Sequence, residues 1–133
     1  MALTPHLQDL AREESLALLG GASLGRVAVS VDALPVVLPV FIAMVDDSIV
    51  FRTVPGIKLS AAVQGAIVAV EADELDERTG EGWSVLVRGI AHEVTDPAVA
   101  DAARGRLGTP WLDGAAEHLV EVSTDLVTGR LLD

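Results

Sequence analysis

Two of the chain's few cations lie in the short stretch FRTVPGIKL, residues 51–59. Arg52 and Lys58 flank a Pro-Gly pair, and Thr53 adds a hydroxyl group beside them. The stretch follows an apolar run and continues with helix-forming residues, which predicts a break between a strand and a helix. Such breaks expose backbone N–H groups and the positive end of a helix dipole, and both attract anions. We expect a site for a small anion, most simply a phosphate; the alternative is a loop with two solvated cations.

The rest of the chain is acidic. Lys58 is the only lysine, and nine Lys and Arg stand against twenty Asp and Glu, for a net charge of −11. Nucleic acids and anionic membranes are bound through basic surface, so this balance argues against both as partners. The longest apolar run, residues 34–45, is shorter than the about 20 residues of a membrane span and contains two prolines. With no basic, apolar leader at its start, the chain is expected to be soluble and cytoplasmic.

Side-chain catalysis has no good candidate in this sequence. There is no cysteine, which excludes disulfides and thiolate chemistry, and no serine lies in a Gly-x-Ser-x-Gly motif. His6, His92 and His118 are far apart without ligand spacing, so no metal site is expected. Six of the twenty acidic residues gather in 71–81 and others lie near expected helix starts, where a solvated face explains them better than a catalytic pair. If the chain is an enzyme, a cofactor should supply the chemistry.

A second stretch of interest, GEGWS at residues 80–84, places glycines directly before a tryptophan at the expected start of a strand. Glycine lets the backbone approach a planar ligand, and the Trp83 indole could pack beside that ligand. The alternative is that Trp83 only anchors the core or an interface.

The spacing of apolar residues predicts one domain, residues 1–133, built mainly from strands. Strands are expected over 24–31, 34–45, 49–53, 66–72, 83–94, 118–123 and 127–132, helices over 4–19, 57–63 and 97–106, and loops over 73–81 and 107–117. Thr4 and Pro5 open the first helix, and Gly20-Gly21 ends it. Pro35 and Pro39 confine the start of their strand to an edge. Strands at hairpin spacing with three helices indicate an antiparallel barrel with attached helices.

Taken together, these residues resemble the flavin-binding split-barrel family that includes pyridoxamine 5′-phosphate oxidase, and in particular its small actinobacterial-type members. The most specific pieces are FRTxxGxKL at 51–59 and GWSVxVxG at 82–89. The similarity extends from LGRVA at 24–28 to TGR at 128–130. It implies a mainly β (α+β) fold, a six-stranded antiparallel split β-barrel with a few peripheral helices. It also implies a homodimer that binds flavin mononucleotide (FMN) in two clefts at the subunit interface.

The resemblance assigns the phosphate end of the flavin to the first stretch. Arg52 and Thr53 lie where the family's strand end meets the flavin and its phosphate, and Lys58 matches the phosphate-binding lysine of the following helix. Ile57 stands where the oxidase has an arginine, and Arg52 would replace some of that charge. This departure leaves a deazaflavin or a haem as an alternative occupant of the cleft.

The ring end is assigned to two other strands. Pro39 and Val40 lie on the hairpin strand whose backbone would border the isoalloxazine ring, and Val37 stands where the oxidase has an arginine. Trp83 and Ser84 match strand positions that reach the ring or the ribityl chain, with Ser84 in place of the oxidase's glutamine.

The function implied is a flavin-dependent oxidoreductase that passes a hydride or electrons at the ring's N5 to a small-molecule substrate or electron acceptor. A deazaflavin-dependent reductase, a non-catalytic flavin, deazaflavin or haem binding module, and a dimeric structural protein with a vacant cleft are the alternatives. The oxidase's C-terminal Arg and His have no clear match, so vitamin B6 oxidation is not expected. No catalytic residue is assigned, and loops 73–81 and 107–117 would select the substrate.

Overall fold

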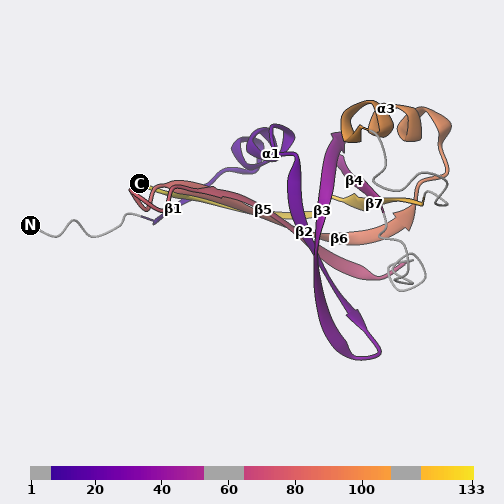
Figure 1. Cartoon of the computed structure of the whole chain (residues 1–133), viewed down its shortest axis with the longest axis horizontal. Coiled ribbons are helices and arrows are strands. Elements are labelled where there is room, and N and C mark those ends of the chain that lie inside the picture. The colour runs from indigo at the N-terminus through magenta and orange to yellow at the C-terminus, as the bar shows by residue number, and fades with distance from the viewer. Residues whose placement is uncertain (1–6, 53–64, 109–117) are drawn as a thin grey trace, which may run out of the picture.

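The computed structural model describes residues 7–52, 65–108 and 118–133, which form eight strands and two helices (Figure 1). In chain order these are β1 (Leu7–Leu10), α1 (Arg12–Gly20), β2 (Leu24–Val31), β3 (Leu34–Val45), β4 (Ser48–Arg52), β5 (Ile67–Leu75), β6 (Gly82–Glu93), α3 (Pro97–Leu107), β7 (Leu119–Ser123) and β8 (Leu126–Leu132). The fold is mainly β, as expected. The helix expected over 57–63, and most of the loop expected over 107–117, lie outside the described residues.

Six of the strands close into an antiparallel barrel, which confirms the expected six-stranded architecture. The sheet runs in the order β1-β8-β6-β5-β2-β3-β4-β7, and an additional pairing of β6 with β7 closes the ring. β8 and β1 continue beyond β6 as an arm that leads away from the barrel toward the two chain ends (Figure 1). β6 therefore pairs with β8 over residues 82–88 and with β7 over residues 91–93.

Valine-rich alternation explains how these strands surround a core. In β2, Val27 and Val29 are buried while Arg26 and Ser30 are exposed, as expected for a strand with one face in the core and the other in solvent. The barrel interior is filled by small aliphatic side chains and one large ring, Phe51. A second apolar cluster lies between α3 and the outer side of the barrel, where four buried residues meet: Val45, Val50, Ala103 and Leu119.

The two strands of the β2–β3 hairpin have the expected bounds, and the prolines lie at an edge as predicted. β3 pairs with β2 along residues 34–41 and turns to β4 only from Ile42 onward. Ile42 donates its N–H to Ser23 O on the β2 side, so the odd-numbered residues of β3 face the open edge. Pro35 and Pro39 remove two donors from that edge, which disfavours pairing with a further strand.

The N-terminal helix was predicted wrongly. Residues 7–10 form β1, which pairs with β8 from Leu7↔Leu132 to Leu10↔Gly129, and the helix begins only at Arg12. Thr4 and Pro5 lie outside the described residues. The helix does end at Gly20, but Gly21 adopts a right-handed conformation (φ −89°) and not the left-handed one expected. A pairing between the two ends of the chain leaves no local signal, so the leucine spacing was read as helical.

The acidic loop after β5 is shorter than predicted. β5 continues through Leu75, with Asp73 opposite Ser84 and Glu74 opposite Trp83, so the connection to β6 comprises only residues 76–81. The helix after Asp96-Pro97 was predicted correctly: α3 spans Pro97–Leu107, and the Asp96 carboxylate accepts a hydrogen bond from Ala98 N at 2.9 Å. Within the described part of the chain, neither helix has the length and apolar character to cross a membrane.

Gly89 lies where the pairing of β6 with β8 ends and its pairing with β7 is about to begin. A Cβ atom at this position would overlap the Ser123 carbonyl oxygen, so only glycine allows the two backbones to approach. Ser123 Oγ accepts a hydrogen bond from Ile90 N at 3.3 Å and donates one to Asp125 at 2.7 Å, which fixes the β7–β8 turn against β6.

Gly89→Ala should therefore destabilise the fold by about 2 kcal/mol or more, because the added methyl group forces the closing strands apart. Gly105→Ala is the matched control: no atom lies within 4 Å of its added Cβ, and alanine in a helix should be neutral or stabilising. Urea unfolding followed by circular dichroism measures both variants. Equal stabilities for the two would show that the close approach at Gly89 does not constrain closure.

Candidate functional site

Arg52, the last described residue of β4, is half-buried beneath the end of α3. Phe51 points into the barrel, whereas Val50 and Arg52 share the opposite face, toward α3. The guanidinium donates through Nη1 to Leu107 O at 3.4 Å and through Nη2 to Gly108 O. These carbonyls belong to the C-terminal end of the helix, where a cation also interacts favourably with the helix dipole. Arg52 thus joins the barrel end to α3, a role that the sequence did not suggest.

Trp83 and Ser84 lie half-buried near the start of β6, between β5 and β8. Trp83 is opposite Glu74 and Leu131, and Ser84 is opposite Asp73 and Arg130. The indole packs against the barrel core, so part of the Trp83 surface does anchor the core.

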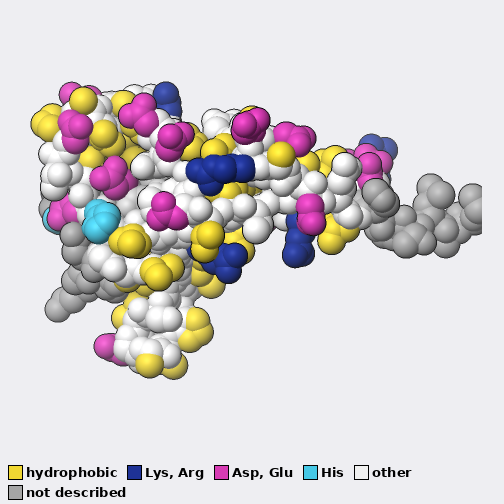
Figure 2. Space-filling model, turned by 180° about the vertical axis from the view of Figure 1, so that it is seen from behind, with side chains coloured by type: hydrophobic (Ala, Val, Ile, Leu, Met, Phe, Trp, Pro, Cys, Tyr) yellow, Lys and Arg dark blue, Asp and Glu magenta, His cyan; other side chains and the backbone are white. Residues whose placement is uncertain are grey.

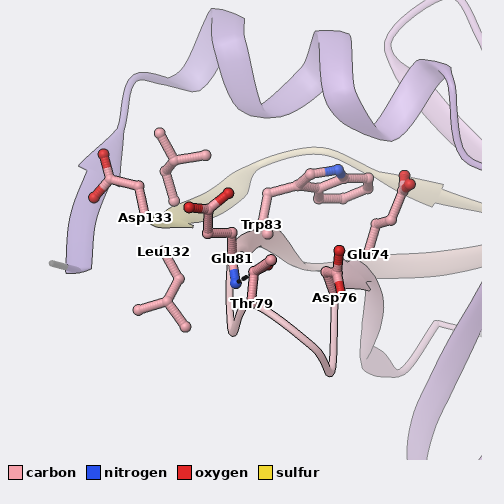
Figure 3. A pocket seen from close by; sticks show the side chains of 9 residues that line it. Glu74, Asp76, Thr79, Glu81, Trp83, Leu132 and Asp133 are labelled. Atoms are coloured by element: carbon pink, nitrogen blue, oxygen red, sulfur yellow. Dashed lines mark hydrogen bonds between the residues drawn. The ribbon is translucent and has the colours of Figure 1, made fainter. Parts of the chain in front are cut away.

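The remaining surface of Trp83 lines an open hollow of about 380 Å³ (Figure 3). Its other lining residues are Glu74, Asp76, Thr79, Glu81, Gly82, Leu131, Leu132 and Asp133. Carboxylates stand on both sides of the indole, so the local potential is negative and disfavours a phosphate in this hollow. The hollow suits an apolar ring or a cation better than an anion.

Pro39 and Val40 have opposite orientations on β3. Pro39 is exposed and lies opposite Arg26, whereas Val40 is only 6% exposed and belongs to the barrel core. A ligand outside the barrel could therefore meet Val40 only through its backbone. Residues 34–40 pair only with β2 among the described residues, so this stretch presents an open backbone edge.

The structure does not bring Arg52 and Trp83 together within one chain, whereas Val40 lies on the strand next to Arg52, two residues before Ile42, which is opposite Phe51. Phe51, which precedes Arg52, is opposite Val120, and Val120 is also opposite Glu93 of β6. Trp83 lies at the other end of β6, and residues 83–93 of a strand span about 33 Å at about 3.3 Å per residue. Arg52 and Trp83 therefore occupy opposite ends of the molecule. Thr53 and Lys58 lie outside the described residues.

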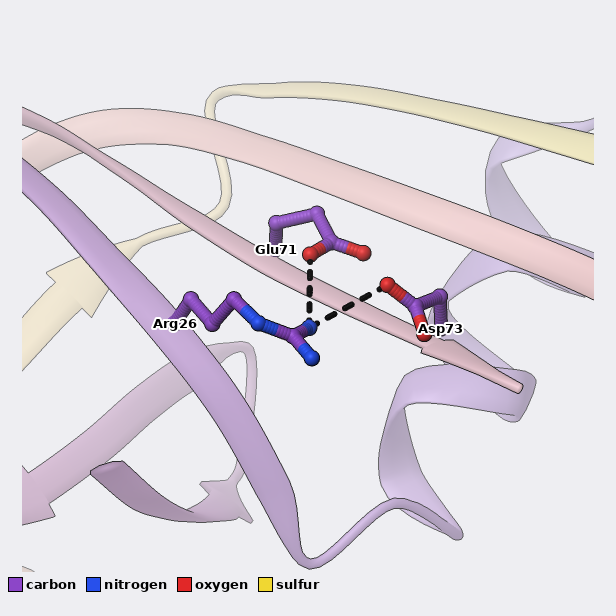
Figure 4. A network of polar contacts seen from close by, with 3 residues as sticks. All are labelled: Arg26, Glu71 and Asp73. Carbon is purple, nitrogen blue, oxygen red and sulfur yellow. Dashed lines mark hydrogen bonds and ion pairs between the residues drawn. The ribbon is translucent and has the colours of Figure 1, made fainter. Parts of the chain in front are cut away.

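A cluster that the sequence analysis missed lies on the outward side of the sheet (Figure 4). Arg26 of β2 contacts two carboxylates of β5 through Nη1, Glu71 at 3.1 Å and Asp73 at 3.2 Å. Burial, with the hydrogen bond and negative charge of Asp73, raises the pKa of Glu71 to about 7 in spite of the lowering effect of Arg26. The alternation of residues along β5 places Glu71 and Asp73 on one face, but their contact with Arg26 becomes visible only from the register of β5 with β2.

Both histidines within the described ranges, His92 and His118, are exposed. His118 Nδ1 lies 2.8 Å from Glu93 Oε1 at the end of β6, and both side chains are exposed. No three His, Asp or Glu side chains of residues 7–52, 65–108 and 118–133 converge where they could hold a metal ion.

Comparison with known proteins matches almost the whole chain. Residues 11–131 match the family model for pyridoxamine 5′-phosphate oxidase. An uncharacterized protein of Mycobacterium tuberculosis is 40% identical over 126 residues, which cover 91% of this chain and 82% of the relative. A solved FAD-binding protein of Mycobacterium smegmatis is 31% identical with a TM-score of 0.73, and 95% of this chain and 98% of that one are covered. A solved FAD-binding protein of Mesorhizobium loti is 25% identical with a TM-score of 0.83, covering 98% and 99%.

The contacts of Arg52 should be measurable without any ligand. Arg52→Ala should lower the free energy of unfolding by about 1–2 kcal/mol, because two charge-assisted contacts to α3 are lost. Asp96→Ala, at the other end of the same helix, is the matched comparison and should cost about 1 kcal/mol. Both are measured by urea unfolding of ligand-free protein. An Arg52→Ala variant as stable as the wild type would mean that its contacts to Leu107 and Gly108 stabilise nothing.

Proposed function

The chain belongs to the pyridoxamine 5′-phosphate oxidase family, and from that membership we propose that it is a flavin-dependent oxidoreductase acting as a homodimer. The observation that carries the proposal is the similarity to two solved FAD-binding proteins over at least 95% of this chain. FMN and FAD share the phosphate next to the ribityl chain, so the stretch 51–59 would serve either nucleotide. The substrate would be a small molecule or an electron acceptor.

The chemical types of the candidate residues suit a flavin. Arg52 and Lys58 supply positive charge for the phosphate, and Thr53 supplies a hydroxyl group. Trp83 offers an apolar wall, and the open edge of β3 near Pro39 offers backbone groups to the rim of a planar ring. When bound, the flavin would supply the hydride or electron transfer. The chain's own residues would bind it, orient it and exclude water from one side of its ring.

A second copy of the chain is part of this proposal because the described strands carry an exposed apolar outward face. Six large apolar side chains on the outward positions of neighbouring strands are 40–74% exposed: Leu24, Val37, Phe41, Ile67, Ile90 and Leu126. The tip of the β2–β3 hairpin projects beyond the barrel and also carries exposed apolar side chains (Figure 2). Apolar surface of this extent commonly marks a protein interface.

Dimerisation through this outward face would also complete the flavin site. Arg52 and Trp83 lie at opposite ends of one chain, and a two-fold axis sets the same surfaces of two chains against each other in antiparallel fashion. The Arg52 end of one protomer would then face the end of its partner that carries Trp83 and Ser84, where Ser84 occupies an outward position and Trp83 lies on the other face of β6. Each dimer would hold two equivalent sites, each built from both chains.

Purified protein tests the cofactor directly. We expect flavin absorbance in the visible range, release of the flavin on denaturation, and bleaching by NAD(P)H with recovery when an acceptor is added. Mass spectrometry of the released compound separates FMN from FAD, a deazaflavin and haem. A flavin that is bound but never reduced would favour a binding module over an enzyme, and colourless protein that takes up no flavin would refute the proposal.

Lys58→Ala should weaken FMN binding about tenfold or more while riboflavin affinity changes little, because one charge-assisted phosphate contact is lost. Arg104→Ala removes the same charge from the exposed surface of α3 and serves as the control. Fluorescence titration measures both ligands with each variant. Equal losses of FMN and riboflavin affinity would show that Lys58 does not contact a phosphate.

Sites shared between two chains predict complementation. Lys58→Ala and Trp83→Leu should each weaken flavin binding, whereas mixed dimers formed by subunit exchange should regain about half of the wild-type sites (about a quarter of all sites in an equal mixture), because each mixed dimer contains one intact site. A chain that carries both substitutions is the control and should not be rescued by itself. No recovery in mixed dimers verified by mass spectrometry would place Lys58 and Trp83 in the same site of one chain, or in no common site.

A further inference from the structure

The Arg26–Glu71–Asp73 cluster lies in the middle of the outward face that the proposed dimer would cover. Arg26 has Pro39 of β3 as its register neighbour on one side, and Glu71 has Leu86 of β6 on its other side. The side chains of Glu71 and Asp73 are 31% and 29% exposed, so each has already lost much of its water. Ionised groups in such surroundings are stable only if their charges are balanced.

The charges of this cluster are not balanced. One guanidinium contacts two carboxylates, so the ionised cluster carries one excess negative charge. The other ionisable groups at outward positions of the strands on this side are Arg88 of β6, Arg130 of β8 with Asp9 of β1 opposite it, and the opposed pair His92 of β6 and Glu121 of β7. None of them contacts Glu71: the residue opposite Glu71 on β6 is Leu86, and the described polar partners of Glu71 are Arg26 and Asp73.

We propose that the Glu71–Asp73 pair takes up a proton when a second copy of the chain covers this face, so that acidification below neutral pH tightens the homodimer. The inference rests on the proposed homodimer and describes its regulation. The proton is held between the two carboxyl groups, and the remaining negative charge is balanced by Arg26. Without that proton, the dimer would bury an uncompensated charge in each protomer.

The direction of the pH effect on dimerisation follows from the pKa of Glu71 in the single chain. Burial, together with the hydrogen bond and charge of Asp73, already raises the pKa of Glu71 to about 7. A partner surface would remove more water, which disfavours the charged form and raises that pKa again. The dimer therefore binds more protons than two monomers do at pH 7–8, and its dissociation constant falls as the pH falls.

Sedimentation velocity at pH 8.5 and pH 6.0 tests this with wild type, Glu71→Gln and Glu77→Gln. The wild-type dissociation constant should be at least about tenfold lower at pH 6.0, since up to one proton per protomer is linked to association. Glu71→Gln carries a neutral group of the same shape and should dimerise tightly at both pH values. Glu77→Gln, in the exposed 76–81 connection, makes the same substitution elsewhere and should keep the wild-type pH dependence.

If the dimer never dissociates measurably, the Glu71 side-chain carboxyl carbon is titrated by NMR, with Glu71→Gln used for assignment. Titration above pH 7 in the dimer supports the inference, and titration below pH 5.5 overturns it. A pH-independent dissociation constant, or a tighter dimer at high pH, overturns this inference alone and leaves the flavin and the dimer standing. A monomer at every pH removes the dimer and this inference together.

Discussion

The architecture depends on one strand that serves three neighbours. β6 pairs with β5 along nearly its whole length, with β8 over its first half and with β7 over its last residues. A strand has only two edges, so β8 must leave the edge before β7 can take it. The Ser123 backbone crosses β6 at Gly89, where a side chain would block it. This crossing allows the barrel to close while β8 and β1 continue outward as an arm.

Closure of this kind makes a long molecule with two separate ends. One end has α3 and Arg52, and the other has the arm with Trp83 and the acidic connection between β5 and β6. Between them lies an outward face that neither of the two described helices covers, because α1 packs beside β8 and α3 packs on the last part of β3 and on β4. Two chemically different ends joined by an apolar face are well suited to a two-fold dimer, since each site can then combine one end of the first copy with the other end of the second.

Local features of this chain could be predicted from the sequence, and features that depend on register could not. The bounds of β2 and β3, the Asp96 cap of α3 and the edge position of Pro35 and Pro39 follow from alternation, capping and the missing proline donor. β1 was missed because its partner lies at the other end of the chain. Glu71 and Asp73 were read as part of a solvated acidic segment, since only the pairing of β5 with β2 shows the shared contact to Arg26.

Arg52 shows the same limit at the candidate site. The sequence places a cation at the end of a strand, which is compatible with an anion nearby. The register of β4 with β7 instead sets that cation beneath the C-terminal carbonyls of α3. Thr53 and Lys58 follow directly in the sequence, but they lie outside the described residues, so the anion site itself stays a prediction.

The scarcity of cations then decides how the phosphate end of a flavin would be held. Among the described arginines, Arg12 holds the Thr124 turn to α1 through contacts of 2.6 and 3.1 Å, Arg26 holds two carboxylates, and Arg52 holds α3. A phosphate beside Arg52 would also stand near the negative end of the α3 dipole, which reduces the attraction of the guanidinium. Lys58 has no lysine to replace it. We therefore expect Lys58, together with the backbone N–H groups of the helix predicted to begin at residue 57, to bear more of the phosphate charge than Arg52 does.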